Sequence, residues 1–543
     1  MHWADVLAEE LSKRGSRHVL ATAITPSGPI HVGNMREVLT TEMVHRSLEK
    51  LGCESELIYI ADSYDPLRKV YPFLDETKFK EHVGKPLSDI PCPDGCHASY
   101  AHHFVEPFLG DLEKLGVHPR VYHAHEMYRK GMYLDATREA LEQTDLIRDI
   151  MVRVAGREGK LPPNWIPFNV QCAGCGRLNG PEPTLYEYPV IEYRCKACGH
   201  EGRKDVREPG GGKLPWRVDW PARWKFLEVT FEAMGKDHAA AGSSWDTGVE
   251  IVQQVYGVPP PVRTVYEFIQ LKSGGAMHSS AGNAVSGSEM LRMTPPETLR
   301  FLIARYQPSK HIDFDPGLGI VDLVNEYDRW EAAYFTGGAE ARKDPQFKEL
   351  DRVMELAQPH HMPTEAPPAI PYNHLVLVTD LTGGAVAKRG VDEPAGSSSD
   401  WPRVKAVLRR SEMIPDDLPP AHEAHLKARV EHARYWLDRF APPEARTRLL
   451  ESWTPEAAAT VTDADRAFYK ALHARLQNGK WTGEAIHNAI HEAGKESGHG
   501  GAKAFGAIYA AFLGAKRGPR AGHFLASLER AFVLKRLQEA AGA

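Results

Sequence analysis

The chain has 543 residues, of which 42% are hydrophobic and 25% are charged, the composition of an ordinary globular protein with more than one domain. Its formal net charge of −6 argues against a protein that coats nucleic acid nonspecifically. No apolar run approaches the ~18 residues of a membrane span, and the N-terminal MHWADVLAEELSKRG lacks the apolar core of a secretory signal, so we predict a cytoplasmic protein without membrane attachment.

The first 75 residues predict a strand–helix–strand unit. Residues 18–24 (HVLATAI) and 56–61 (ELIYIA) read as short buried strands, and residues 34–51 carry apolar side chains at helical spacing. This order is typical of a βαβ unit, hence of a parallel sheet that binds ligands at the carboxyl ends of its strands.

The connection between the first strand and the helix is TPSGPIHVGN, residues 25–34. Pro26 and Gly28 predict a tight turn, and Gly33 leaves room for a ligand at the start of the helix, where free amides and the helix dipole favour phosphate. His31 is placed to donate a hydrogen bond to a phosphate oxygen. The stretch is neither a GxxxxGKS loop nor GxGxxG, which disfavours an ordinary NTPase or dinucleotide fold. The alternative is a helix-capping turn with an incidental histidine.

Residues 76–215 predict a mixed insertion that holds two CxxC pairs. Cys172 with Cys175 and Cys195 with Cys198 have zinc-ribbon spacing, and each pair is followed by a glycine that permits the turn. Four thiolates leave no open position on the metal, so we predict a structural zinc. The remaining cysteines are Cys53, Cys92 and Cys96. Because the spacing of Cys92, Cys96 and His97 is poor for a metal site, we expect a loop with free thiols there.

The second half of the chain begins with sheet-like sequence and ends in helices. VEIVQQVYG (249–257) and VRTVYEFIQL (262–271) predict a return to the sheet, and helical patterns dominate from about Asp322 onward. Residues 358–371 and 382–402 are rich in Pro, Gly and Ser and read as surface loops. The C-terminal end is locally basic, with Lys503, Lys516, Arg517, Arg520, Arg530, Lys535 and Arg536 forming either a contact face or a solvated helix face.

The turn TPSGPIHVGN resembles the HIGH signature of class I aminoacyl-tRNA synthetases, with Asn34 in place of the last histidine. Together with the following MREVLTTEMVHRSL it is similar to the class I lysyl-tRNA synthetases. The likeness extends over nearly the whole chain in the order of that family: SYDPLRKV (63–70), GCHASYAHHF (95–104), WRVDWPARW (216–224), GKDHAAAGSSWDTG (235–248) and KRGPRAGHFLASLERAFVLKRL near the end.

The resemblance implies an α/β fold in which a Rossmann-type parallel sheet forms the catalytic domain and an all-helical anticodon-binding domain follows. The implied boundaries are residues 1–75 and 216–275 for the two halves of the Rossmann domain, 76–215 for the connective insertion with its zinc ribbon at 172–198, 276–345 for a signature loop and helical stem-contact region, and 346–543 for the anticodon-binding domain.

The resemblance also implies site residues. ATP is expected to meet Pro26, Ser27, Gly28, His31, Gly33, Asn34, Gly235, Asp237 and Met277. Lysine is expected to meet Thr25, Gly28, Trp216, Asp219, His238, Tyr266 and Glu267. The catalytic residues are expected to be His31, Asn34, His278, Ser279 and Ser280. An ε-ammonium on an apolar stem needs a carboxylate and aromatic walls, which Asp219 and Glu267 with their neighbours offer; Asp62 and Asp65 are the reserve candidates. A Trp-rich stretch is also typical of a core.

The stretch AMHSSAGNAVS (276–286) has the position of the KMSKS loop of the family but lacks its lysines. Ala276 and Ala281 stand where relatives have lysine, and a lost charge contact there is worth about 2–4 kcal/mol of transition-state stabilisation. His278, Lys272 or Lys236 could take over that role, and the alternative is a plain flexible loop.

The activity that the resemblance implies is lysine–tRNA ligation. ATP with Mg²⁺ activates L-lysine to lysyl-adenylate, the lysine passes to the 3′ end of tRNA(Lys), and zinc stabilises the insertion. We expect a monomer. Two alternatives stay open: a paralogue with impaired adenylation that acts by binding tRNA or in regulation, and a class I synthetase for another amino acid.

Overall fold

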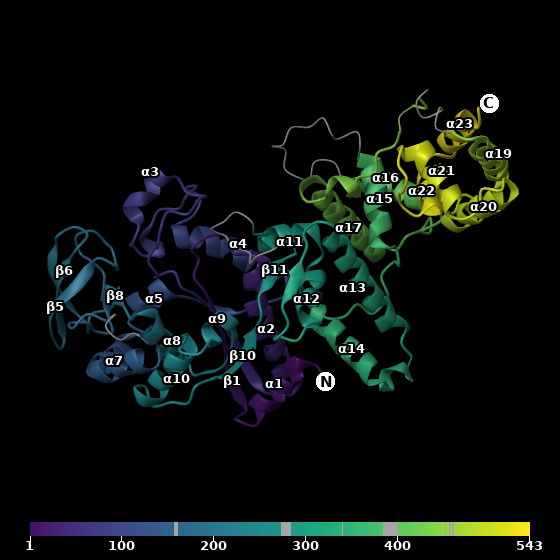
Figure 1. Cartoon of the computed structure of the whole chain (residues 1–543). Coiled ribbons are helices and arrows are strands. Elements are labelled where there is room, and N and C mark those ends of the chain that lie inside the picture. Colours follow the sequence, from purple (N-terminus) through teal and green to yellow (C-terminus); the bar gives the residue numbers. More distant parts are fainter. Residues whose placement is uncertain are drawn as a thin grey trace. The chain divides into compact units, whose positions relative to one another are not determined.

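The computed structural model describes residues 1–156, 161–272, 284–338, 340–383, 400–450, 452–454, 458 and 461–542. This part of the chain forms two compact units (Figure 1). The first comprises Met1–Leu291, Leu299–Asp315 and Gly338–Met362, and the second comprises Arg292–Thr298, Pro316–Gly337 and Pro363–Ala543. None of the described helices combines the length and apolarity that crossing a membrane requires.

A parallel five-stranded sheet organises the first unit, in the order β10-β9-β1-β2-β3. The strands are β1 (Arg17–Ile24), β2 (Glu54–Ala61), β3 (Arg120–His123), β9 (Val229–Gly235) and β10 (Val262–Tyr266). Helix α2 (Val32–Lys50) connects β1 to β2, so the predicted βαβ unit is confirmed.

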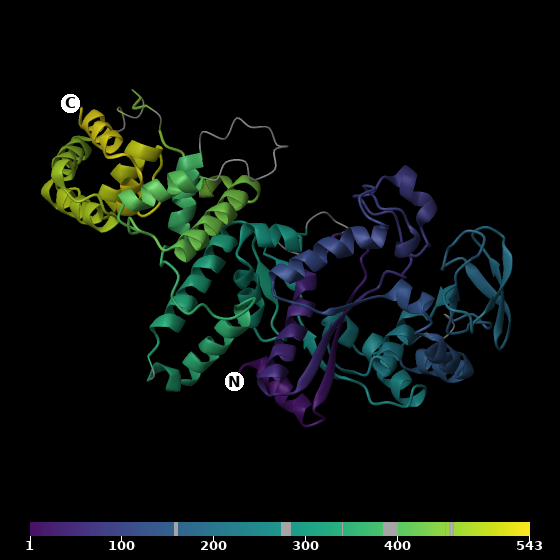
Figure 2. The same ribbon diagram turned by 180° about the vertical axis from the view of Figure 1, so that it is seen from behind.

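Both faces of the sheet are covered, because its residues alternate between two buried environments. Val19, Ala21 and Ile58 belong to a core cluster that they share with the tryptophans of α8 (Trp216–Phe226) and with Ile251 of α10 (Ser244–Gln254). Leu20 and Tyr59 are fully buried outside that cluster, and α2 packs on β1, β2 and β9. Figure 2 shows α1 and α2 beside the strands from the opposite side.

The remaining helices of the first unit are α1 (Trp3–Ser12), α3 (Glu76–Phe79), α4 (Tyr100–Lys114), α5 (Ala124–Arg129), α6 (Leu134–Glu142), α7 (Thr144–Arg153), α9 (Lys236–Ala239), α11 (Gly287–Met293), α12 (Pro296–Ala304) and α14 (Pro345–Ala357), with the ends of α11 and α12 shared with the second unit. Short 3₁₀ turns lie at Lys80–His82, Leu87–Asp89 and Ala341–Lys343.

The insertion carries its own small sheets. Strands β5 (Pro181–Glu187), β6 (Val190–Cys195) and β7 (Glu201–Asp205) form an antiparallel ribbon, and β4 (Asn169–Val170) pairs with β8 (Gly212–Lys213). In the main body, β11 (Ile269–Leu271) pairs in parallel with β12 (Ile312–Phe314).

One predicted strand is a helix. The stretch 249–257 lies mostly in α10, whose buried residues Trp245, Gly248, Ile251 and Val252 have helical spacing. Its valines and isoleucine favour strands intrinsically, but packing of Trp245 against Trp224 of α8, with ring centroids 5.2 Å apart, decides the local structure.

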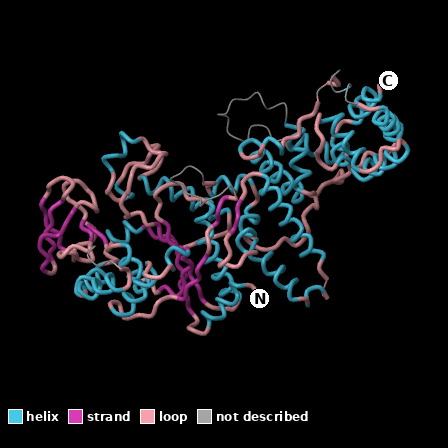
Figure 3. Tube along the Cα trace, in the orientation of Figure 1, coloured by secondary structure: helices cyan, strands magenta, loops and turns pink. Residues whose placement is uncertain are grey.

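The described residues of the second unit form helices and loops (Figure 3). Its helices are α13 (Leu318–Thr336), α15 (Tyr372–Gly383), α16 (Trp401–Arg410), α17 (Pro420–Arg439), α19 (Asp463–Asn478), α20 (Gly483–Glu496), α21 (Ala502–Leu513), α22 (Ala521–Ser527) and α23 (Arg530–Ala541), with a 3₁₀ turn at Pro443–Ala445. Of the basic C-terminal residues, Arg530 donates to the carbonyls of Leu476 and Gly479 and buried Arg536 to that of Ala511. These two arginines therefore bind carbonyl groups at the carboxyl ends of α19 and α21.

Candidate active site and metal centres

The predicted ligand-binding segments meet at one edge of the parallel sheet. The register pairs Ile24 with Ala61 and Gly235 with Tyr266, so the carboxyl ends of β1, β2, β9 and β10 lie side by side. The turn 25–34, Asp62 to Asp65, the segment 235–238 and Glu267 each follow directly on one of these ends. This is the edge at which open α/β sheets bind ligands.

The turn at the end of β1 is held from two sides. The hydroxyl of Tyr100 donates to the carbonyl of Ser27 at 2.7 Å, and Thr25 Oγ1 donates to a carboxylate oxygen of Asp65 at 3.1 Å. His31 is the N-cap residue of α2, and Asn34 Oδ1 accepts from its backbone N–H at 3.2 Å. The helix thus begins at the residue that the sequence assigns to phosphate binding, with its N-terminus at the ligand edge.

The two segments at the ends of β9 and β10 are joined by an ion pair. Lys236 Nζ lies 2.7 Å from Glu267 Oε2, and both side chains are partly exposed. A Cβ on Gly235 would lie 2.6 Å from a carboxylate oxygen of Asp237, so the two residues are in close approach at this end of β9. Asp237 keeps 59% of its side chain exposed and is open to a ligand.

Aromatic rings form a wall near this edge. Trp216 and Trp220 stack with centroids 5.2 Å apart, and the ring of His238 lies 6.0 Å from Trp216. His238 Nδ1 is 3.0 Å from the hydroxyl of Ser244. The structure therefore brings Trp216 and His238 together, as the sequence analysis expects.

Asp219 lies inside a saturated network instead of facing open space. Its side chain is 0% exposed, and its oxygens accept from the hydroxyls of Tyr128 and Tyr133 and from Arg223 Nε at 2.6–2.9 Å. Lys213 Nζ lies 3.4 Å away. Although burial acts to raise the pKa of Asp219, the charges of Arg223 and Lys213 hold it below its usual value. Nothing in this geometry leaves an oxygen for a substrate cation.

The reserve candidates belong to the same network. Asp62 is buried and bound by Arg223, and Asp65 lies 2.6 Å from Lys213 Nζ. Lys213 comes from β8 of the insertion, so this ion pair fastens the insertion to the sheet. Breaking one partner of such a buried network is costly, because a charge is left unpaired.

Met277, His278, Ser279 and Ser280 lie outside the described residues, as do Ala276 and Ala281. The described end of this stretch is well placed for the predicted role. Val32 donates to the carbonyl of Val285 at 3.0 Å, and His31 and Ser286 form an isolated bridge. The last residues of the predicted signature loop therefore run beside the phosphate-binding turn.

Two charged residues of α2 reach this edge without having been assigned a role from the sequence. Arg36 is 1% exposed and donates to backbone carbonyls, and Glu37 accepts from Ala23 N and from the hydroxyl of Tyr266. The signal that could have found them is their position, since two adjacent charged residues stand between the buried apolar Met35 and Val38 of this helix.

The four predicted zinc ligands meet in one cluster. The Sγ atoms of Cys172 and Cys198 are 3.6 Å apart and those of Cys175 and Cys195 are 3.7 Å apart, and all four lie within 4.8 Å of one another. Four sulfurs at about 2.3 Å from a tetrahedral zinc would be about 3.8 Å apart, so the cluster fits this ion. Gly176 and Gly199 have φ values of 74° and 76°, the left-handed conformation that each knuckle turn requires.

The thiols of Cys92 and Cys96 are free, as expected, but they belong to a second cluster. His97 and His103 of α4 join them, with all four ligand atoms within 4.8 Å. Cys92 Sγ is 3.7 Å from Cys96 Sγ and 3.4 Å from His103 Nδ1. The far nitrogens of the two histidines face carboxylates, at 3.4 Å for His97 with Glu106 and 3.6 Å for His103 with Asp94. Carboxylates in that position orient metal-binding histidines, so the donor set suits zinc.

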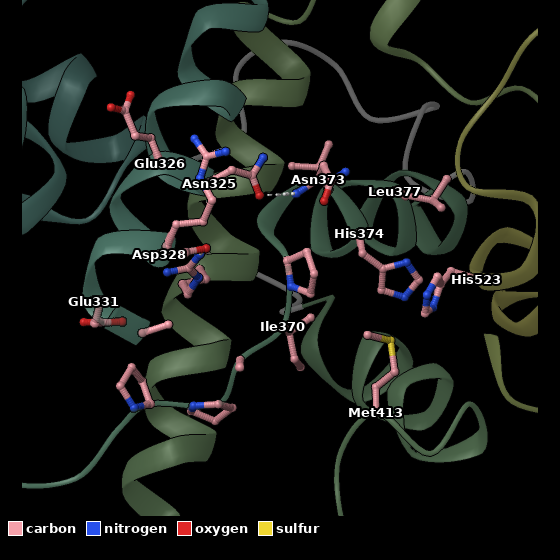
Figure 4. Close-up of a pocket in the computed structure, with 18 of the residues that line it drawn as sticks. Asn325, Glu326, Asp328, Glu331, Ile370, Asn373, His374, Leu377, Met413 and His523 are labelled. Carbon is pink, nitrogen blue, oxygen red and sulfur yellow. Dashed lines mark hydrogen bonds and ion pairs between the residues drawn. The ribbon is translucent and has the colours of Figure 1, made fainter. Parts of the chain in front are cut away.

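The second unit contains a cavity of about 810 Å³ that none of the predicted site residues lines. Figure 4 shows Glu326, Asp328 and Glu331 of α13 along one side and His374 with His523 on the other. Asp328 is bound by Arg429 at 2.6 Å, and burial raises the pKa of Glu331 to about 7. The proline-rich residues 366–371 complete its wall.

The chain is similar to known proteins along nearly its whole length. A family model described as tRNA synthetases class I (K) matches residues 1–360, and one described as anticodon binding domain matches residues 426–541. A lysine–tRNA ligase of Methanosarcina barkeri (strain Fusaro) is 41% identical over 99% of this chain and 98% of that protein. One of Methanocaldococcus jannaschii is 41% identical over 99% of each chain. The solved glutamate–tRNA ligase of Elizabethkingia meningosepticum covers 97% of this chain and 99% of its own, with 13% identity and a TM-score of 0.41.

Proposed function

From the premise that the chain belongs to the class I lysyl-tRNA synthetases, we propose how its residues carry out the reaction of that family. The protein is an ATP-dependent lysine–tRNA ligase, with lysine and tRNA(Lys) as its substrates. The observation that carries the residue assignments is the meeting of four predicted segments at the carboxyl edge of the sheet.

ATP is placed along β1 and β9. The amides at the start of α2, with His31 and Asn34, bind the phosphates, and Asp237 beside Gly235 accepts the two ribose hydroxyls. Support comes from the helix N-terminus at this edge and from the exposed carboxylate of Asp237. Mg²⁺ would neutralise the phosphates during attack at the α-phosphate.

Lysine is placed beside the aromatic wall of Trp216, with His238, Tyr266 and Glu267. A partly exposed carboxylate next to aromatic rings suits an ε-ammonium, and Glu267 has that exposure whereas Asp219 is fully buried. Glu267 is paired with Lys236 at 2.7 Å. A bound ε-ammonium would compete with the ammonium of Lys236 for this carboxylate.

Adenylation then needs positioning and charge stabilisation, without a general base, because the carboxylate of lysine is already nucleophilic. The loop that contains His278, Ser279 and Ser280 is proposed to approach the phosphates. Support comes from its flanking residues, which pair with the turn at His31. Relatives place lysines where Ala276 and Ala281 stand, so a substitute cation such as Lys272 is part of the proposal.

Zinc is proposed at both cysteine clusters. In each it would be held by four protein ligands, a closed set that stabilises the fold of the insertion and leaves no position for water. We further propose that the enzyme acts as a monomer in the cytoplasm.

The proposed assignments are tested by ATP–pyrophosphate exchange with lysine, with and without tRNA(Lys). Lysine-dependent exchange that His31→Ala removes and Cys53→Ser leaves intact would support them. Exchange that is indifferent to His31→Ala would remove the assigned role of the turn.

A further inference from the structure

Arg36 is a buried charge that binds only carbonyl groups among the described residues. Its guanidinium donates to the backbone oxygens of Glu267 and Phe268, which follow β10, and to those of Gln307, Pro308 and Lys310, with Lys310 at 2.6 Å. Burial lowers its pKa to about 10. The planar fork with five donors can satisfy several carbonyls at once, which a lysine cannot do.

Glu37, the next residue of α2, binds the side chain of Tyr266, which directly precedes this turn. Its Oε2 accepts from the hydroxyl of Tyr266 at 2.9 Å, and its Oε1 accepts from Ala23 N of β1 at 3.0 Å. Tyr266 is 7% exposed, so its hydroxyl has little access to water as an alternative partner. Burial raises the pKa of Glu37 to about 8, despite the hydrogen bonds from Ala23 and Tyr266 that oppose this shift.

The turn after β10 is bound from two sides. Among the described residues β10 is an edge strand of the five-stranded sheet, and the turn that follows it is tied to a neighbouring segment: Glu267 N–H donates to the carbonyl of Pro308 at 2.9 Å, and Ile312 N–H donates to that of Phe268 at 3.3 Å. Arg36 and Glu37 add contacts from α2, the helix whose first turn carries His31 and Asn34. Consecutive helix residues point about 100° apart, which lets one reach the backbone and the other the tyrosine hydroxyl.

We propose that Arg36 and Glu37 are positioning residues for lysine activation: Glu37 orients Tyr266, and Arg36 fixes the Glu267–Phe268 turn against the ATP-binding helix. The inference rests on the proposed function, in which Tyr266 and Glu267 contact lysine. Through these two residues one rigid helix sets the distance between the ATP end and the lysine end of the site.

The first test is a double-mutant cycle on Glu37 and Tyr266, read as kcat/KM for lysine in ATP–pyrophosphate exchange. Glu37→Ala and Tyr266→Phe should each lower this value by about 2–10-fold, the effect of losing a neutral hydrogen bond, because a pKa of about 8 leaves most of Glu37 protonated at neutral pH. Because Glu37 acts through the tyrosine hydroxyl, the double variant should have a kcat/KM for lysine no lower than that of the more impaired single variant. Additive losses would overturn the assignment.

The second test uses a matched control on the same helix. Arg46 also clamps backbone carbonyls, those of Gln358 and His360 at 2.7 and 2.8 Å, but these lie away from the β10 turn. Arg36→Lys should raise KM for lysine about 10-fold or more while KM for ATP changes less than about threefold; Arg46→Lys should change neither. Equal effects of the two substitutions, or a fall in kcat with both KM values unchanged, would contradict a positioning role.

Two further measurements keep the outcomes distinct. Wild-type exchange is measured first, since its absence would overturn the proposed function itself, whereas an active wild type with unaffected variants overturns only the present inference. If Arg36→Lys does not fold, the comparison of Glu37→Gln with Glu37→Ala tests the positioning role instead. It keeps an acceptor for the tyrosine and should retain more lysine activity than Glu37→Ala, and equal losses would refute the role of Glu37.

Discussion

The two cysteine clusters predict about two zinc ions per chain. A substitution in either cluster should remove one ion and leave the other in place. Cys195→Ser removes one of four thiolates from the ribbon, in which the paired sulfurs are 3.6 and 3.7 Å apart, close to the ~3.8 Å of a tetrahedral zinc site. The expected result is a fall from about two zinc ions to about one. Cys96→Ser should cause the same loss at the Cys92–Cys96–His97–His103 cluster, and the double variant should retain almost none.

Mass spectrometry of the metal content of gel-filtered protein measures this directly. Structural zinc contributes about 10–16 kcal/mol in zinc-finger peptides, so each loss should also lower the melting temperature of the first unit. Cys53→Ser is the control, because Cys53 belongs to neither cluster. A wild type with one zinc would refute the second site, and a folded wild type with no zinc would refute both.

The other predictions concern catalysis and pH. His31→Ala should slow adenylation by about 10²–10³-fold with little change in KM for lysine, and equal losses in both would indicate a folding defect instead. Glu267→Gln should raise KM for lysine about 10–100-fold and leave KM for ATP nearly unchanged; an unaffected lysine requirement would place the ammonium partner elsewhere. Ala276→Lys should speed adenylation in rapid-quench experiments unless another cation already fills that place, in which case Lys272→Ala should slow it; if neither changes the rate, the loop is not catalytic. The folded-state pKa of Glu37 is raised to about 8 from a usual 4.5, so its contribution to stability is fully present below about pH 4.5 and is lost as the pH rises through about 8. Relative to Glu37→Gln, the wild type should lose up to about 1.4 kcal/mol of unfolding free energy per pH unit in this window in urea titrations, and parallel pH profiles would contradict this.

Local patterns were sufficient for the parts of the fold that depend on local physics. The apolar strands around α2 and the CxxC pairs with their glycines specify a βαβ unit and a four-cysteine cluster without knowledge of the rest of the chain. Residues 249–257 show the limit, because β-branched residues favoured a strand and packing against the tryptophans of α8 made them helical.

The site was predictable as a set of segments but not as a set of contacts. Asp219 stands between two tryptophans in sequence, and helical spacing already brings Arg223 of the same motif beside it. Lys213 and Tyr128, which also bind it, come from positions whose approach only the fold determines. His103 completes the second cysteine cluster because it projects from α4 next to the loop of Cys92, a spacing that matches no common metal motif.

Lysine specificity is tested most directly by ATP–pyrophosphate exchange by the purified wild type across the standard amino acids and ornithine, with and without tRNA(Lys). We expect exchange with L-lysine well above that with arginine, ornithine or any other amino acid, and transfer of labelled lysine to tRNA(Lys). Exchange driven best by another amino acid, or none with lysine under either condition while tRNA still binds, would contradict it.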